Sequence, residues 1–171
     1  MKIDKIIVGP LQENCYIISN NNKCIVVDPG DEFNKIYDKL KDKEVVNVII
    51  THYHFDHIGC IDKFPKEKIL DYSNLEEREY NIDNFEFEVI YTPGHKEDAI
   101  TILFKNKNIM FTGDFIFRDS IGRTDLKGGD INKMKESLKK IMKYSDTIVI
   151  YPGHGDSTTL GYEKNNFKYY M

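Results

Sequence analysis

Apolar residues fall in short runs separated by turn-forming residues, a pattern typical of β-strands. Val45–Ile50 is almost continuously apolar, as expected of a strand that is buried on both faces. Phe85–Tyr91 alternates apolar with acidic residues, which predicts a strand with one face in the core and the other in solvent. Further strands are predicted at 5–8, 15–19, 24–28, 99–105, 108–114 and 147–151, with a hairpin turn at residues 106–108.

Two segments carry apolar residues at helical spacing, 33–41 and the segment that begins after Asp130. The second places four apolar residues on one face: Ile131, Met134, Leu138 and Ile141. A short helix is also predicted over 58–64. Another is predicted to begin at Ser73, because Ser73-x-x-Glu76 has the spacing of a capping box. Many strands with helices set between some of them predict an α/β fold, a pair of mixed sheets flanked by helices, in one domain over residues 1–171.

Composition narrows the class of protein. Hydrophobic residues make up 40% of the 171 residues and charged residues 30%, which is typical of a globular protein. No apolar run reaches 18 residues and the N-terminus lacks a signal-peptide core, so we expect a cytoplasmic protein with no membrane partner. The net charge is −4 and no basic block occurs, which argues against nucleic-acid binding. The three cysteines, Cys15, Cys24 and Cys60, form no Cys-x-x-Cys pair, which argues against disulfides and a thiolate metal site.

The positions of the histidines along the sequence indicate a functional site. Three of the five histidines lie within six residues, in the motif Thr51-His52-Tyr53-His54-Phe55-Asp56-His57, directly after a predicted strand. His95 and His154 each follow Pro-Gly at the end of another predicted strand, and Asp114 follows a glycine in the same way. Loops at strand ends are held by a rigid scaffold, so these side chains are expected to converge.

Seven potential ligands are too many for one tetrahedral ion. Imidazole and carboxylate groups suit zinc and related first-row metals, and three or four of them fill one site. Seven therefore predict two divalent ions with one shared carboxylate, expected to be zinc, with iron or manganese as alternatives. Isolated histidines are more often inert, but this clustering favours ligation. Asp28 is left with two interpretations, orienting a ligand or capping its Pro-Gly turn, whereas Asn14 and Tyr16 are interpreted as strand and turn residues.

The motifs together resemble the metallo-β-lactamase superfamily, and within it the small glyoxalase II-like (hydroxyacylglutathione hydrolase-like) group. The resemblance covers most of the chain, through ENCYII, VVDPG, THYHFDHIG, TPGH, TGDFIFRDSIGRTDLKGGD and YPGHGDSTTLGYEKNN. It implies an αββα sandwich with a dinuclear site at one edge. Carried over residue by residue, it implies one ion held by His52, His54 and His95, a second held by Asp56, His57 and His154, and Asp114 as the bridge.

The resemblance also implies a reaction, the hydrolysis of a thioester or ester by a hydroxide that bridges the metals. Asp56 and Asp114 would belong to the catalytic centre as ligands, and Asp56 is not assigned as a general base. Secreted β-lactamases of the superfamily replace the bridging aspartate, and its flavo-diiron members have Glu where His54 stands, so neither activity is expected here.

Departures from the glyoxalase pattern leave the substrate's thiol part open. Classical members carry a C-terminal helical domain that binds glutathione, but only the 17 residues 155–171 follow His154. His95 is followed by the charged run Lys96-Glu97-Asp98, and the segment 60–85 is short. Arg123 is expected to pair with Asp125 or Asp119 rather than with substrate.

Three hypotheses follow. The first is a metallo-hydrolase acting on a small molecule. The second is a mononuclear iron oxidoreductase like the persulfide dioxygenases of the same superfamily. The third is a metal-binding module without turnover. The sequence does not indicate an oligomeric state.

Overall fold

A computed structural model describes all 171 residues of the chain, Met1–Met171. Most strands belong to two sheets. The first sheet has the order β1-β2-β3-β4-β5, with bounds β1 (Lys2–Val8), β2 (Glu13–Asn20), β3 (Lys23–Val27), β4 (Glu44–Ile49) and β5 (Ile69–Leu70). The second has the order β13-β12-β9-β8-β7-β6, with bounds β6 (Glu79–Ile82), β7 (Phe85–Tyr91), β8 (Ile100–Phe104), β9 (Ile109–Gly113), β12 (Val149–Pro152) and β13 (Thr158–Thr159). A separate small hairpin joins β10 (Ile116–Phe117) to β11 (Ser120–Ile121).

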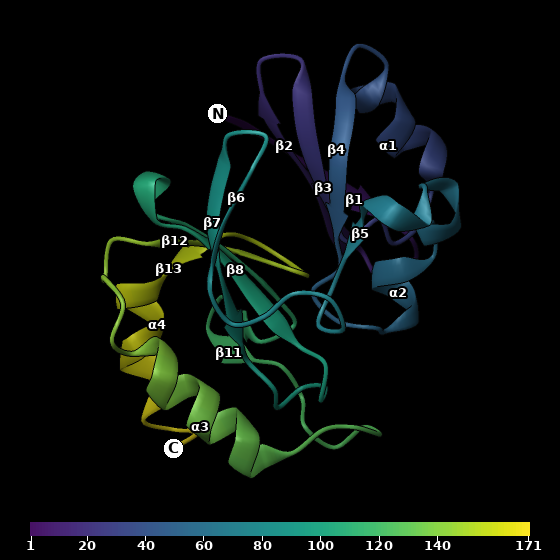
Figure 1. Ribbon diagram of the computed structural model, residues 1–171. Helices are drawn as coiled ribbons and strands as arrows, with labels where there is room; N and C mark the ends of the chain where they lie inside the picture. Colours follow the sequence, from purple (N-terminus) through teal and green to yellow (C-terminus); the bar gives the residue numbers. More distant parts are fainter.

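Helices lie on the outer faces of the two sheets (Figure 1). The α-helices are α1 (Phe33–Leu40), α2 (Phe55–Ile58), α3 (Ile131–Ile141) and α4 (Leu160–Phe167), and short 3₁₀ turns occupy Ile61–Lys63, Lys66–Lys68 and Lys105–Lys107. In Figure 1, α1 and α2 lie beside the first sheet and α3 and α4 beside the second. The chain is thus the predicted four-layer αββα sandwich in a single domain.

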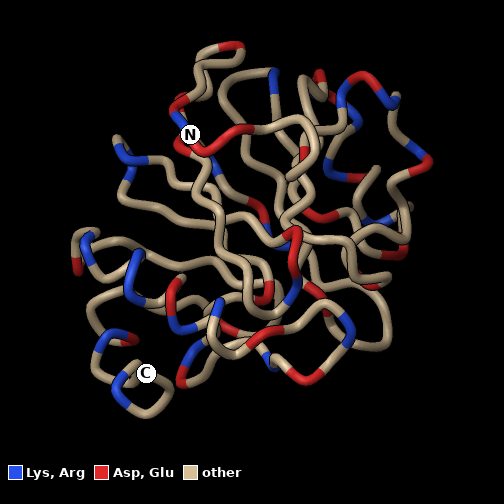
Figure 2. The backbone as a smooth tube through the Cα atoms, turned by 60° about the horizontal axis from the view of Figure 1, so that its bottom comes forward, with Lys and Arg blue, Asp and Glu red and all other residues tan.

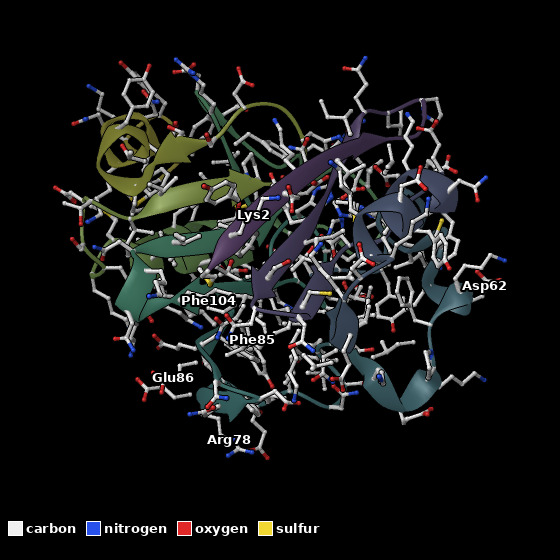
Figure 3. All side chains as sticks on the ribbon, turned by 90° about the horizontal axis from the view of Figure 1, so that it is seen from above. Lys2, Asp62, Arg78, Phe85, Glu86 and Phe104 are labelled. Carbon is white, nitrogen blue, oxygen red and sulfur yellow. The ribbon has the colours of Figure 1, made fainter.

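Three apolar cores hold the four layers together. The core between the sheets includes Phe85 and Phe104, which are labelled in Figure 3. One outer core packs Ile36 and Leu40 of α1 against the first sheet. The other packs Met134, Leu138 and Ile141 of α3, with Leu160 and Phe167 of α4, against the second sheet. Each sheet therefore buries both faces, and the predicted two-sided burial of the Val45–Ile50 strand is confirmed, with Val46 in the middle core and Val48 in an outer one.

Strand direction brings the functional loops to one edge. In the first sheet, β3 and β4 are parallel neighbours, so both end at the same side. In the second, β12 is parallel to β9, and β9 is antiparallel to β8, which is antiparallel to β7. β7, β9 and β12 consequently run the same way and end together. The loops after β3, β4, β7, β9 and β12 carry Asp28, His52–His57, His95, Asp114 and His154.

Several local predictions hold and others are wrong. The helix over 33–41 is confirmed as α1, and Asp130 caps α3 by accepting hydrogen bonds from the main-chain N–H groups of Asn132 and Lys133. Ile131, however, is 44% exposed rather than part of the buried face. The predicted helix over 58–64 is wrong: α2 lies earlier, and only a 3₁₀ turn follows it.

The predicted capping box at Ser73 is also wrong. The main-chain N–H and the hydroxyl of Ser73 both donate to the Asp71 carboxylate, at 2.7 and 2.6 Å. Asp71 therefore organises a turn in place of a helix, since such local side-chain bonds compete with helix formation. The C-terminal helix α4 was not predicted, although Thr159 caps it by accepting from the N–H of Tyr162.

Candidate metal centre

The structure gathers all seven predicted side chains at the shared strand edge. They form two groups, and within each group the ligating atoms lie within 4.8 Å of one another. One group consists of His52, His54, His95 and Asp114, and the other of Asp56, His57 and His154. Pro-Gly or single-glycine turns precede His95, Asp114 and His154. At Gly153 the space is fully used, because a Cβ there would lie 2.4 Å from Asp114 Oδ1 and 2.6 Å from His57 Cε1.

Three imidazoles converge in the first group. His54 Nδ1 lies 3.1 Å from His52 Nε2 and 2.8 Å from His95 Nε2. Nitrogens that share a tetrahedral ion at about 2.0–2.1 Å are separated by roughly 3.3 Å, so the spacing is close to that of a ligand set. His52 and His95 are buried and His54 is partly exposed, which leaves this point open to solvent on one side.

The second group mixes imidazole and carboxylate. Asp56 Oδ2 lies 3.2 Å from His154 Nε2 and 3.9 Å from His57 Nε2. His57 is fully buried, whereas His154 is partly exposed. The second group therefore reaches from the interior to the surface beside the first.

Asp114 lies between the two groups. Its Oδ2 atom is 3.5 Å from His95 Nε2 in the first group. Its Oδ1 atom is 3.3 Å from His57 Nε2 and 3.6 Å from His154 Nε2 in the second. Both Oδ1 of Asp114 and Nε2 of His57 are buried without a hydrogen-bond partner in the protein. Buried polar atoms of this kind need an explanation, and a shared cation supplies one.

Neighbouring groups prepare the imidazoles as ligands. His95 Nδ1 donates to the carbonyl of Arg123 at 2.7 Å, and His154 Nδ1 donates to the carbonyl of Leu11 at 3.0 Å. Nδ1 of His52 lies 3.2 Å from the Thr51 hydroxyl, whose own proton goes to Asp28. A proton held on Nδ1 leaves the Nε2 lone pair free, so these rings present a ligating atom to the centre. The donor set therefore fits first-row divalent metals.

The Asp28 side chain bonds to Thr51 and to His57, one of the predicted ligands, which favours the interpretation that it orients a ligand. Its Oδ2 atom lies 3.0 Å from His57 Nδ1 and accepts the Thr51 hydroxyl at 2.6 Å, and its Oδ1 accepts the Thr51 N–H at 2.7 Å. The residue has φ of +49°, a left-handed conformation that aspartate tolerates better than most residues. Asp28 thereby ties the motif loop after β4 to the end of β3.

The pKa values follow from burial and from charge. Burial lowers the pKa of His52 well below its usual range and also lowers that of His54, which favours the neutral form of both rings. Burial also opposes charge on His57, but the adjacent Asp28 and Asp114 raise its pKa well above the usual range. For His154, burial is likewise outweighed by Asp56 and Asp114, and the pKa is raised. Without ions, His57 and His154 therefore hold a proton more tightly than His52 and His54 do.

Sequence reasoning missed the residues that hold the His154 loop. Tyr16 donates its hydroxyl to the Pro152 carbonyl at 2.6 Å, and the Asn14 side chain donates to the carbonyls of Pro152 and Gly155. Neighbouring Glu13 is 1% exposed, and burial raises its pKa well above the usual range, the attraction of His57 being too weak to compensate. These residues act on a loop that is about 140 positions away along the chain, and only the ENCYII resemblance could have suggested them.

Arg123 forms the predicted surface pair. Its guanidinium makes two hydrogen bonds of 2.7 Å to the carboxylate of Asp125, and both side chains are more than 60% exposed. On the other side of the motif, Tyr53 turns away from the centre and donates to Asp71 at 2.6 Å. Burial and this hydrogen bond raise the pKa of Tyr53 to about 12.

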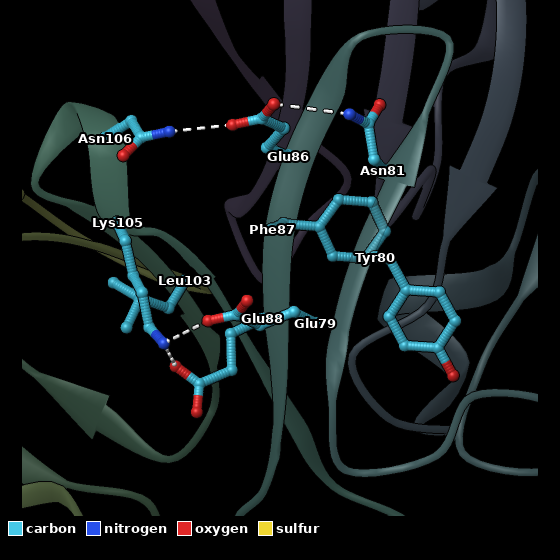
Figure 4. Close-up of a pocket in the computed structure, with 9 residues that line it drawn as sticks. All are labelled: Glu79, Tyr80, Asn81, Glu86, Phe87, Glu88, Leu103, Lys105 and Asn106. Carbon is cyan, nitrogen blue, oxygen red and sulfur yellow. Dashed lines mark hydrogen bonds and ion pairs between the residues drawn. The ribbon is translucent and has the colours of Figure 1, made fainter.

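Charge and shape elsewhere on the surface differ from those of the metal centre. Acidic and basic residues are interspersed along the chain rather than gathered by sign (Figure 2). A pocket of about 430 Å³ lies over β6, β7 and β8, but it contains none of the seven side chains (Figure 4). Its only cation, Lys105, is already paired with Glu79 and Glu88. None of the α-helices has the length and hydrophobicity that a membrane-spanning helix requires.

An αββα sandwich with two adjoining His/Asp groups at its edge is the arrangement of the metallo-hydrolase superfamily. A family model described as "Metallo-beta-lactamase superfamily" matches residues 8–72 and 64–154, and the chain belongs to this superfamily. The fold implies a dinuclear site for divalent metals.

Known proteins similar to this chain agree with that assignment. It is 30% identical to hydroxyacylglutathione hydrolase GloC of Haemophilus influenzae, over 97% of this chain and 96% of that protein. Among solved structures, it is similar to BLEG-1 B3 metallo-beta-lactamase, with a TM-score of 0.91 and 27% identity over 96% of this chain and 97% of that one. It is also similar to TTHA1623 in a di-iron-bound form, with a TM-score of 0.83 and 28% identity over 95% and 98% of the two chains.

Proposed function

We propose that the protein is a two-metal hydrolase that cleaves a thioester or ester of a small molecule, with zinc as the expected metal. The observation that carries the proposal is the position of Asp114, which presents one carboxylate oxygen to each of the two ligand groups. His52, His54 and His95 would hold one ion, Asp56, His57 and His154 the other, and Asp114 both.

When bound, two divalent ions would lower the pKa of a water molecule so that it is activated near neutral pH. Their positive charge would also polarise the carbonyl group of the substrate. The chain's own contribution is to orient the ligands. Asp28 holds the Nδ1 proton of His57, and the carbonyls of Arg123 and Leu11 hold those of His95 and His154. Asp56 and Asp114 act as ligands, and no serine or cysteine nucleophile is required.

The thioester class is supported by the similarity to GloC, which is described as a hydroxyacylglutathione hydrolase. The charged run after His95 is compatible with a polar substrate. Lys96 lies within 4 Å of both Glu97 and Asp98, so its positive charge is already balanced locally. Arg123 is paired as well. The proposal therefore assigns the acyl-transfer chemistry to the metal centre and leaves the identity of the thiol open.

The test is an assay of the zinc-loaded protein against S-lactoylglutathione, a simple oxygen ester and a β-lactam, each with wild type and Asp114→Asn. We expect turnover of the thioester, loss of at least about 100-fold in Asp114→Asn, and no β-lactam hydrolysis. Asp146→Asn is the matched control, since Asp146 is 72% exposed and pairs only with Lys164. Absence of thioester and ester hydrolysis at full zinc loading would contradict the proposal.

A further inference from the structure

Glu13 is a buried acid with no evident structural partner. It begins β2 and is 1% exposed, and neither of its carboxyl oxygens has a hydrogen-bond partner in the protein. An unpartnered carboxyl inside a protein is costly, commonly by several kcal/mol when charged, as general transfer data show. A residue that served only to extend the strand would not need this side chain.

The Glu13 carboxyl is aimed at the metal-ligand segment. Its Oε1 atom lies 3.8 Å from His57 Nδ1, the same nitrogen that Asp28 contacts at 3.0 Å. The ligating atoms of Glu13, Asp28 and His57 all lie within 4.8 Å of one another. Gly30 leaves room for this arrangement, because a Cβ there would lie 2.7 Å from Glu13 Oε2 and 1.8 Å from the carbonyl of Asp56.

The main chain at Glu13 reaches the other imidazole of the same group. Glu13 and His154 form an isolated antiparallel bridge between the two sheets. Next to it, the N–H of Asn14 donates to the carbonyl of Gly153 at 2.7 Å. The side chain of Glu13 therefore faces His57 while its backbone pairs with His154.

We propose that Glu13 is a positioning residue for the second ion, because its carboxyl lies against the Nδ1 side of His57 and its main chain pairs with His154. The inference rests on the proposed assignment of two ions. Its specificity comes from what Glu13 does not touch: its recorded ion-pair and bridge contacts are with His57 and His154, and none is with His52, His54 or His95. Loss of the carboxyl should therefore affect one ion and spare the other.

The Glu13 carboxyl supports His57 in a different way from Asp28. Asp28 also bonds Thr51 and so ties two loops together, whereas the one ion-pair contact of the Glu13 carboxyl is with His57 Nδ1. Replacing it with the equally shaped amide of Gln keeps the volume and the backbone bridge. Glu13→Gln therefore tests the side chain's action on His57 alone.

The experiment measures stepwise zinc affinity of the whole chain by competition with a chromophoric chelator. Cobalt(II) absorption serves as a second reporter of ligand geometry. We expect Glu13→Gln to weaken the second ion about 10-fold, the lower end of the range for outer residues that orient ligands, and to leave the first ion within twofold. Ser19→Ala is the control, because the buried Ser19 hydroxyl on the same strand also lacks a partner but lies at the strand's far end.

Unchanged affinity for both ions would overturn the inference, and so would equal weakening of both, which indicates a general structural role. If Glu13→Gln gives no folded protein, Glu13→Asp is measured in the same way, because it keeps the acid but withdraws it from His57. These affinities are measured without substrate. A chain that binds two zinc ions and hydrolyses nothing would contradict the proposed function but not the role of Glu13.

Discussion

Asp28 and His57 form a buried pair, with 3.0 Å between Oδ2 and Nδ1 and at most 2% of either side chain exposed. The two residues come from the ends of different strands, and their contact fixes the ring that faces Asp114. Asp28 is the main reason that the pKa of His57 in the metal-free protein lies above its usual range despite burial.

This pair predicts a pH-dependent effect of Asp28→Asn. The raised pKa of folded His57 means that the pair's stabilisation is fully present below the unfolded histidine pKa of about 6.5 and is lost as pH rises through the folded value. We expect the variant to lower the unfolding free energy of the metal-free protein by about 3 kcal/mol near pH 6. At high pH the loss in unfolding free energy should be smaller, because only the Asp28 contacts to Thr51 then contribute to it. Urea unfolding of both proteins at several pH values measures this difference in unfolding free energy. A difference that is the same at all pH values would contradict the predicted pH dependence.

The two ions should differ in acid sensitivity. Burial lowers the pKa values of His52 and His54, whereas carboxylates raise those of His57 and His154. Metal must displace more protons from the second group as the pH falls, since only deprotonated ligands bind. We predict that stepwise dialysis from pH 8 to pH 5 releases the second ion first, with metal content measured at each step. Retention of the second ion after the first has left would show that the pKa order is reversed.

Tyr16 should stabilise the His154 loop through one buried hydrogen bond. Tyr16→Phe removes the hydroxyl that donates to the Pro152 carbonyl at 2.6 Å. Leaving that buried acceptor with one fewer donor should lower the unfolding free energy by about 1 kcal/mol. Tyr151→Phe is the matched control, because the Tyr151 ring packs against Tyr16 and Phe111 but its hydroxyl forms no hydrogen bond within the protein. Equal stability changes in the two variants would contradict the role of the Tyr16 hydroxyl.

Gly153 should be intolerant of a side chain because the space beside it belongs to the ligands. A Cβ would contact Asp114 Oδ1 at 2.4 Å and His57 Cε1 at 2.6 Å. We predict that Gly153→Ala purifies with fewer than two metal ions per chain and loses most of its activity. Gly155→Ala in the same loop has open space around its Cβ but a φ of +76°, so it should lose about 1 kcal/mol of stability and keep its metals. Full metal content in Gly153→Ala would contradict this prediction and show that the loop can shift to accommodate the methyl group.

Much of the architecture could be predicted from the hydrophobic pattern, because the long strands and α1 bury regular stripes. The convergence of the candidate ligands could also be predicted, since every candidate sits where a strand ends. Ser73 misled the prediction because Asp71 captures its donors, which depends on the turn's geometry rather than on its spacing. The roles of Glu13, Asn14 and Tyr16 could not be predicted, because their contacts form only when the two sheets pack and bring β2 to the His154 loop.

The most direct test of the account is a crystal structure of the metal-loaded protein, with metal identity taken from anomalous scattering and content from elemental analysis. The account predicts two divalent ions per chain, one among His52, His54 and His95 and one among Asp56, His57 and His154, with Asp114 contacting both. A single iron bound by two histidines and one aspartate, with oxygen consumed on a glutathione persulfide, would contradict it and favour the oxidoreductase hypothesis.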